Sequence, residues 1–135
     1  MSRSHKANHY GTLCEQKAAE RYGLELDRSS WHDARRGDGA PIEVKSTMYR
    51  HADGQPGTFK LYSTYHRKLR RENGWYVFVV YRIRGRGIQV VCMEMRHSSR
   101  LPKLNWHGGG AHRNAYQSKL PIADIFGKSA LRRYD

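Results

Sequence analysis

Residues 33–47 read DARRGDGAPIEVKST, and the main structural prediction for this chain starts from this segment. Its first half holds an Asp-Gly dipeptide at positions 38–39, which is typical of a tight turn between two extended segments. Its second half, residues 41–47, alternates apolar and polar side chains, and this period of two predicts a strand with one buried face. Glu43 and Lys45 would then lie next to each other on the polar face.

The predicted turn would bring Asp33 close to Glu43, ten residues later, so that the two carboxylates could share a ligand. Two carboxylates at one point repel each other unless a cation lies between them. Oxygen ligands with open positions suit Mg²⁺, which keeps several waters and accepts substrate phosphates. Lys45, beside that cation, could orient or help to deprotonate an attacking water. The three residues therefore fit metal-assisted hydrolysis of a phosphodiester.

Two alternatives to this interpretation stay open at the level of sequence. A Glu-x-Lys triplet is common on exposed strands, so Asp33, Glu43 and Lys45 could be ordinary surface residues. Asp38 could replace Asp33 as the first ligand, but its position inside the turn is more typical of a residue that forms the turn.

The rest of the chain supplies helices and strands around this segment. Apolar periodicity and turn residues predict an opening helix, an extended stretch that reaches Asp33, a basic helix with Ser63 as its N-cap, and several strands. The predicted ranges are 8–22 (helix), 24–33 (extended), 58–62 (strand), 63–71 (helix), 75–81 (central strand), 88–93 (strand) and 120–126 (apolar segment). This order predicts an α/β fold with a mixed central β-sheet flanked by helices.

We expect one domain over residues 1–135, with its core at about 8–95. Residues 96–135 would be an accessory segment that contacts DNA or a second subunit. The longest strongly apolar run, residues 75–81, is far shorter than the ~20 residues of a membrane span, and no apolar signal region follows the first residues. We therefore expect no membrane partner and a cytoplasmic location, in a prokaryotic or viral setting.

The charge of the chain indicates which class of partner it binds. The 135 residues include 25 Lys and Arg against 12 Asp and Glu, a formal net charge of +13 at pH 7. Hydrophobic residues make up 38% of the chain, too many for a disordered basic tail. Two cysteines far apart in sequence indicate neither a disulfide framework nor a zinc knuckle. A folded protein of this charge is expected to bind a polyanion, most simply a nucleic acid.

The string of Asp33, nine further residues and Glu43-Val44-Lys45 resembles the PD-(D/E)xK nuclease signature, with His32 where the signature has Pro. Within that superfamily the chain is similar to archaeal Holliday junction resolvases, which share a leading helix with a Gly and a Glu and an IEVK strand. It is also similar to PvuII-type restriction enzymes in its short Asp-to-Glu spacing. The resemblance covers roughly residues 10–95.

The resemblance implies a restriction-endonuclease-like fold and a set of roles for the site. Asp33, Glu43 and the backbone carbonyl of Val44 would bind Mg²⁺, with Mn²⁺ able to substitute, and Lys45 would position the nucleophilic water. Glu15 would lie near the same pocket as a further acid, unless it is an ordinary glutamate on the helix surface. No organic cofactor is implied, and a homodimer is expected because two DNA strands are cut.

The leading hypothesis is a Mg²⁺-dependent DNA endonuclease that resolves Holliday junctions or other branched DNA. Its alternatives are a type II restriction-like, site-specific endonuclease that reads double-stranded DNA, and a non-catalytic nucleic-acid-binding protein. The excess charge favours contacts to the DNA backbone, which fix position without reading sequence. The candidate phosphate contacts are Arg35, Arg36, Lys60, Arg67, Lys68, Arg70, Arg71, Arg84 and Arg86.

Two further patterns have weaker functional interpretations. His107, His112 and Asn114 surround a Gly triplet, but no strand–helix frame or cysteine pair supports a metal site there, and a basic loop that contacts DNA or a second subunit is the better interpretation. The Arg-Gly-Arg-Gly run at residues 84–87 lies between two predicted strands. A phosphate-binding glycine loop would instead precede a helix.

Overall fold

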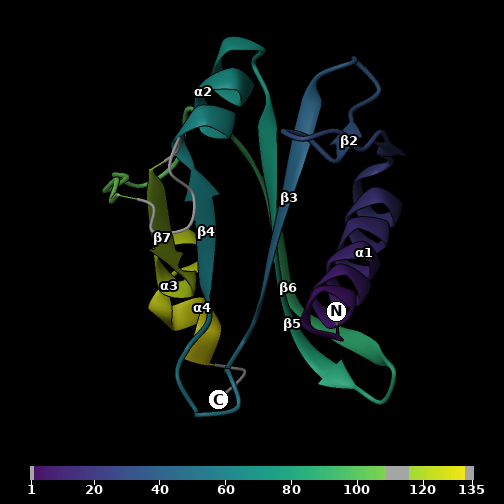
Figure 1. Cartoon of the computed structure of the whole chain (residues 1–135), viewed down its shortest axis with the longest axis vertical. Coiled ribbons are helices and arrows are strands. Elements are labelled where there is room, and N and C mark those ends of the chain that lie inside the picture. Colours follow the sequence, from purple (N-terminus) through teal and green to yellow (C-terminus); the bar gives the residue numbers. More distant parts are fainter. Residues whose placement is uncertain (1, 109–115, 133–135) are drawn as a thin grey trace.

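The computed structural model describes residues 2–108 and 116–132. Its elements, in chain order, are α1 (Ser2–Tyr22), β1 (Glu25–Leu26), β2 (Ala34–Arg35), β3 (Pro41–Met48), β4 (Thr58–Tyr62), α2 (Ser63–Arg71), β5 (Trp75–Arg84), β6 (Gly87–His97), β7 (Gln117–Pro121), α3 (Ile122–Phe126) and α4 (Lys128–Arg132). The predicted α/β fold with a mixed sheet and flanking helices is confirmed (Figure 1).

The main sheet has five strands in the order β1-β2-β3-β5-β6. β3 and β5 run parallel, and the other neighbours are antiparallel. β5 is the central long strand because residues 76–81 are apolar and buried without a break, as a strand covered on both faces requires. β4 and β7 form a separate two-stranded antiparallel sheet, called the β4–β7 ribbon below.

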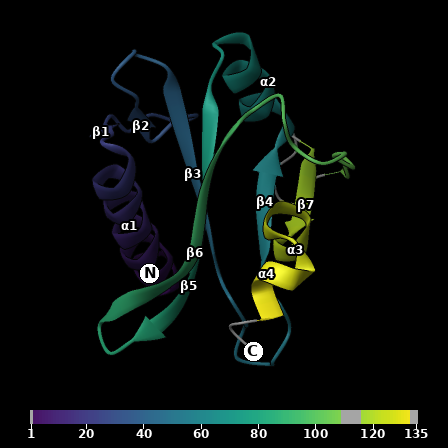
Figure 2. The same cartoon turned by 180° about the vertical axis from the view of Figure 1, so that it is seen from behind.

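Two apolar cores lie on opposite faces of the main sheet. On one face α1 packs through Cys14 and Ala18 against Val77 and Val79 of β5. On the other face the β4–β7 ribbon, α2 and α3 enclose a core that contains Phe59. Figures 1 and 2 show this layering, with α1 on one side of β3, β5 and β6 and the ribbon with α3 and α4 on the other.

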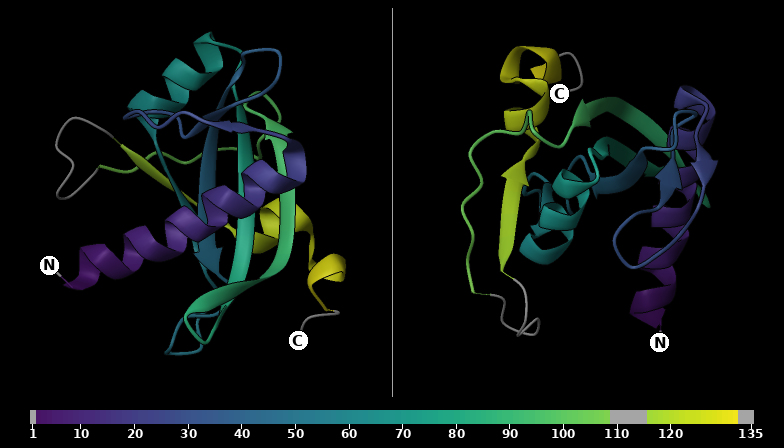
Figure 3. Two further views of the ribbon diagram at one scale, coloured as in Figure 1. Left: turned by 90° about the vertical axis from the view of Figure 1, so that its right-hand side faces the viewer. Right: turned by 90° about the horizontal axis from the view of Figure 1, so that it is seen from above.

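The C-terminal part contributes to the second core. Leu120 of β7 and Ile122 and Ile125 of α3 are buried in the same cluster as Phe59. Two turned views show β7, α3 and α4 against the rest of the molecule (Figure 3).

His112 and Asn114 lie outside the described residues. In residues 2–108 and 116–132, no helix combines the length and the apolar character that a membrane crossing requires.

Most predicted elements match, and one cap does not. Ser63 is the first residue of α2 instead of its N-cap, which is Tyr62 and makes no side-chain capping bond. The Ser63 hydroxyl is engaged elsewhere, because it accepts a hydrogen bond from the backbone amide of Tyr116 at 3.1 Å. The prediction of Ser63 as a cap was wrong because a long-range contact to the segment before β7 competes with local capping.

Candidate active site

The outer edge of β3 is open where the predicted site begins. β2 pairs with β3 only at Pro41 and Ile42, so among the described strands none pairs with that edge from Glu43 onward. Asp33 continues the contact instead. Its amide donates to the carbonyl of Ile42 at 2.7 Å, and its Oδ2 accepts a hydrogen bond from the amide of Val44 at 2.8 Å. The Asp33 carboxylate therefore occupies the place of the next strand.

This bond also fixes the direction of the Val44 peptide groups. In an extended strand the N–H and C=O of one residue point to the same side. The amide of Val44 points sideways from the edge of β3 to Asp33. Its carbonyl oxygen therefore also points to this open edge and away from β5. The predicted carbonyl ligand is thus on the same side of β3 as the Asp33 carboxylate.

Glu43 lies beside Asp33 in an unusual electrostatic setting. Burial raises the pKa of its carboxyl to about 9, the charge on Lys45 opposes that rise, and a hydrogen bond with Asp33 adds to it. The charges of Asp33 and Glu15 act in the same direction. Burial, the hydrogen bond with Asp33 and the nearby negative charges thus all favour the protonated form of the Glu43 carboxyl in the isolated protein.

Lys45 follows Glu43 by one strand repeat, so both side chains leave the same face of β3. Its ammonium lies 5.3 Å from the centre of the Tyr62 ring, at the end of β4. This distance is within the range of a cation–π contact. Lys45 is thus placed between the Glu43 carboxyl and an aromatic ring from another strand.

Glu15 approaches this group from α1. Burial raises the pKa of its carboxyl, a hydrogen bond from Arg28 lowers it, and the charge of Asp33 raises it. Nε of Arg28 donates to Oε1 of Glu15 at 2.7 Å. Within the described chain no three His, Cys, Asp or Glu side chains form a ready metal-ligand group. Glu15 thus lies near enough to Asp33 and Glu43 for their charges to interact, but its own carboxylate is paired with Arg28.

Asp38 stabilises the turn between β2 and β3, as its position in the sequence predicted. Its Oδ1 accepts a hydrogen bond from the amide of Ala40 at 3.1 Å, two residues later, as turn-forming aspartates do. Gly39, between them, has a φ of 87°, a conformation that favours glycine. The carboxylate that reaches the β3 edge is that of Asp33.

A comparison with protein-family models gives a match over most of the chain. Residues 1–127 match the model of the PD-(D/E)XK nuclease superfamily domain. The chain belongs to the PD-(D/E)XK nuclease superfamily. The resemblance predicted from the sequence is confirmed at this level, and so is the restriction-endonuclease-like fold. A search of curated proteins finds no match.

The structure divides the cations that the sequence predicted as DNA contacts in this nuclease domain into two groups. Arg35 is held by Asp27 at 2.7 Å and by the carbonyl of Gly39 at 2.9 Å, and the Arg36 guanidinium lies 4.3 Å from the Trp75 ring centre. These two are engaged within the protein. The exposed members are Lys60, Arg67, Arg70, Arg71, Arg84, Arg86 and Lys68, and of these Lys68 also contacts an aromatic ring, with its ammonium 5.8 Å from the Trp31 ring centre.

Two aromatic neighbours of the candidate site were not predicted. Tyr62 contacts Lys45, and Tyr76 lies opposite Glu43 in the parallel register of β3 and β5. Burial, and then the charge of Glu43, raise the pKa of Tyr76, whose hydroxyl shares a 2.7 Å hydrogen bond with Nδ1 of His66. The β-branched and aromatic pattern predicted these strands, but their register, which places Tyr76 beside Glu43, required the fold.

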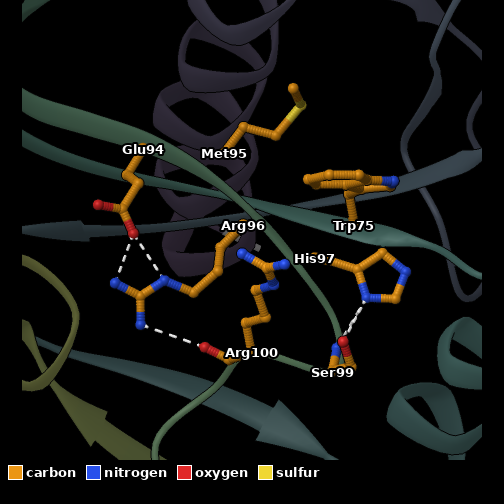
Figure 4. Close-up of a pocket in the computed structure, with 7 residues that line it drawn as sticks. All are labelled: Trp75, Glu94, Met95, Arg96, His97, Ser99 and Arg100. Atoms are coloured by element: carbon orange, nitrogen blue, oxygen red, sulfur yellow. Dashed lines mark hydrogen bonds and ion pairs between the residues drawn. The ribbon is translucent and has the colours of Figure 1, made fainter.

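A cavity of about 650 Å³ at the free edge of β6 lies apart from this group of residues. Figure 4 shows its lining, in which the Arg96 guanidinium is bound by the Glu94 carboxylate. Arg96 also donates to the carbonyl of Ile125 at 2.8 Å. None of Glu15, Asp33, Glu43 and Lys45 lines this cavity, so in the nuclease domain the acidic pair at the β3 edge is the better candidate for catalysis.

Proposed function

We propose that the chain is a metal-dependent DNA endonuclease with its active site at the open edge of β3. The observation that carries the proposal is the position of the Asp33 carboxylate. It accepts a hydrogen bond from the Val44 amide and lies against the Glu43 carboxyl, and Glu43 precedes Lys45 by one strand repeat. In a member of the PD-(D/E)XK nuclease superfamily, this is the residue set that the signature leads us to expect.

The donor set fits a hard divalent cation. Asp33 and Glu43 offer carboxylate oxygens, and the Val44 carbonyl points to the same edge. The raised pKa of Glu43 means that the two acids do not ionise together in isolation, and a bound cation would favour the doubly ionised pair. Mg²⁺, with Mn²⁺ as a substitute, suits such ligands and keeps positions open for water and phosphate.

The residues around the cation have distinct tasks in phosphodiester hydrolysis. When bound, the metal ion supplies Lewis-acid stabilisation of the phosphate and lowers the pKa of a bound water. Lys45 holds its ammonium beside Glu43, where it can orient the attacking water and stabilise charge on the phosphate oxygens. Glu15, which is paired with Arg28 on the α1 side, raises the pKa of the Glu43 carboxyl through its negative charge.

For the substrate we propose branched DNA, cut by a homodimer. The net charge of +13 and the exposed arginines of α2 and of the β5–β6 turn favour contacts to phosphates over contacts to bases. Shape, as in a four-way junction, is then the property that the protein reads. A site-specific restriction-like activity would require base contacts in addition.

The test is cleavage of a labelled four-way junction and of duplexes of varied sequence, in Mg²⁺ and in EDTA. We expect junction cleavage that requires the metal and falls at least ~100-fold in Glu43→Gln and Lys45→Ala. Glu20→Gln and Lys17→Ala, exposed residues of α1, are the matched controls and should retain activity.

Each other outcome has a definite meaning. Cleavage of one duplex sequence in preference to the junction would favour the restriction-like alternative. Binding without cleavage of any DNA by the wild type would favour the non-catalytic alternative. Cleavage that survives both site substitutions would show that the site assignment is wrong.

A further inference from the structure

The β4–β7 ribbon has one buried and one exposed face. Phe59 and Leu61 of β4, with Ser118 and Leu120 of β7, point into the core. The alternate residues face outward, and the central outward pair is formed by two exposed lysines. Because side chains alternate with a period of two, the buried residues fix which residues face the solvent.

The outward lysines are Lys60 and Lys119, which lie directly opposite each other in the antiparallel register. Like charges at opposed positions of a sheet destabilise it. Neither strand carries an acidic residue, and in the part of the chain that the structure describes neither ammonium has an ion pair or hydrogen bond. The pair thus opposes ribbon stability in the free protein, and an anion bound across it would remove the repulsion.

The outer face of the β4–β7 ribbon ends near the candidate active site. Tyr62 follows Lys60 by one strand repeat, roughly 6.6 Å along β4, and its ring contacts the ammonium of Lys45. A hollow of about 380 Å³ borders Lys119, and Asn105 and Gln117, two residues with amide side chains, are among the residues that line it. The ribbon therefore presents cations and amide groups in continuity with the place where a phosphodiester would be cut.

We propose that the outer face of the β4–β7 ribbon binds the phosphodiester backbone of DNA, with Lys60 and Lys119 in contact with phosphates. This inference rests on the proposed function and adds a surface to it. A two-stranded ribbon has the size to lie along a DNA groove, where outward lysines reach the flanking phosphates. The overall charge of the chain is complementary to such a partner.

The test measures binding in EDTA, so that it does not depend on cleavage. The dissociation constant for a labelled duplex and a four-way junction is measured against salt concentration by fluorescence anisotropy. The variants are Lys60→Gln, Lys119→Gln, their combination and Lys119→Glu. Lys17→Gln removes the same charge from α1, on the other side of the main sheet, and is the matched control (Figure 1).

We expect each ribbon lysine replaced by Gln to reduce the slope of log affinity against log salt by about 0.9, and the combination by about twice that. The control should leave the slope unchanged. Lys119→Glu should weaken DNA binding further, yet raise the urea midpoint of the free protein, because it replaces a repulsive pair by an attractive one.

This trade-off separates a binding role from a structural one. An unchanged salt slope in the double variant would overturn the proposal, as would a loss of stability in Lys119→Glu. If the wild type cuts DNA while the ribbon variants bind it normally, the ribbon proposal fails and the nuclease proposal stands. If the ribbon variants bind DNA weakly and the wild type never cuts DNA, the ribbon proposal stands and the nuclease proposal fails.

Discussion

The backbone amide of Val44 donates a hydrogen bond of 2.8 Å to Oδ2 of Asp33, so a side chain takes the place of a neighbouring strand at the edge of β3. One carboxylate thereby has two functions, since it satisfies a backbone donor and faces the Glu43 carboxyl. Under the proposed function, fold stability and metal binding both depend on this residue, and substitutions can separate the two effects.

Asp33→Ala removes the acceptor of the Val44 amide and should lower the free energy of unfolding by about 1–3 kcal/mol. Asp33→Asn keeps an oxygen acceptor and should stay within about 1 kcal/mol of the wild type, yet lose most Mg²⁺ or Mn²⁺ affinity. Urea titration and calorimetric metal titration measure the two effects. Asp38→Ala is the control and should leave metal affinity intact. Loss of metal binding in that variant alone would make Asp38 the ligand.

Tyr62→Leu should slow cleavage by about 2- to 30-fold, because a cation–π contact worth ~0.5–2 kcal/mol no longer holds Lys45. Tyr62→Phe keeps the ring and should cleave at close to the wild-type rate. Single-turnover rates measure both, and Tyr116→Leu, at an exposed tyrosine, is the control. In a Lys45→Ala background the Leu substitution should have no further effect. An equal loss in both backgrounds would indicate that the ring only supports the fold.

Gly57→Ala should destabilise the protein by about 3 kcal/mol, because the added Cβ would overlap the backbone oxygen of Met48 and the Thr47 hydroxyl. Gly57 lies where the chain passes from β3 to β4, so the clash would also displace the strand that carries Tyr62. Gly37→Ala is the matched control, with open space around the new atom and an expected change within about 1 kcal/mol. Urea midpoints that fall equally in both variants would contradict this explanation.

The thiol of Cys14 should be alkylated slowly in the native protein until the pH approaches 11. Burial raises its pKa to about 11 and a hydrogen bond with Ser46 partly opposes the rise, so the reactive thiolate is scarce at pH 8. A raised pKa also means that this residue's contribution to stability is complete below pH ~9, the ordinary thiol range, and is lost as the pH rises toward 11.

The measurement is the rate of iodoacetamide reaction against pH, followed by mass spectrometry in a Cys92→Ser background. The same protein in urea is the control and should reach half of its maximal rate at about pH 8.5. Matching pH profiles in the native and unfolded states would show that the fold does not protect Cys14.

Local sequence patterns were sufficient to predict the parts of the site that lie close together along the chain. The alternation over residues 41–48 assigned Glu43 and Lys45 to one face, because a strand has a period of two. The turn around Gly39 brought Asp33 back to the β3 edge, since only a short hairpin-like connection separates the two segments. The net charge, likewise, needed no structure to indicate a polyanionic partner.

Contacts between residues far apart in the chain could be found only from the three-dimensional structure. The pairing of Glu15 with Arg28, of Tyr62 with Lys45 and of Lys60 with Lys119 depends on how helices and strands pack, and local patterns carry no record of it. Burying Phe59 and Leu120 together sets the register of β4 and β7, and that register opposes the two lysines. Local chemistry thus determined which groups the site contains, while burial of distant apolar residues decided which groups surround it.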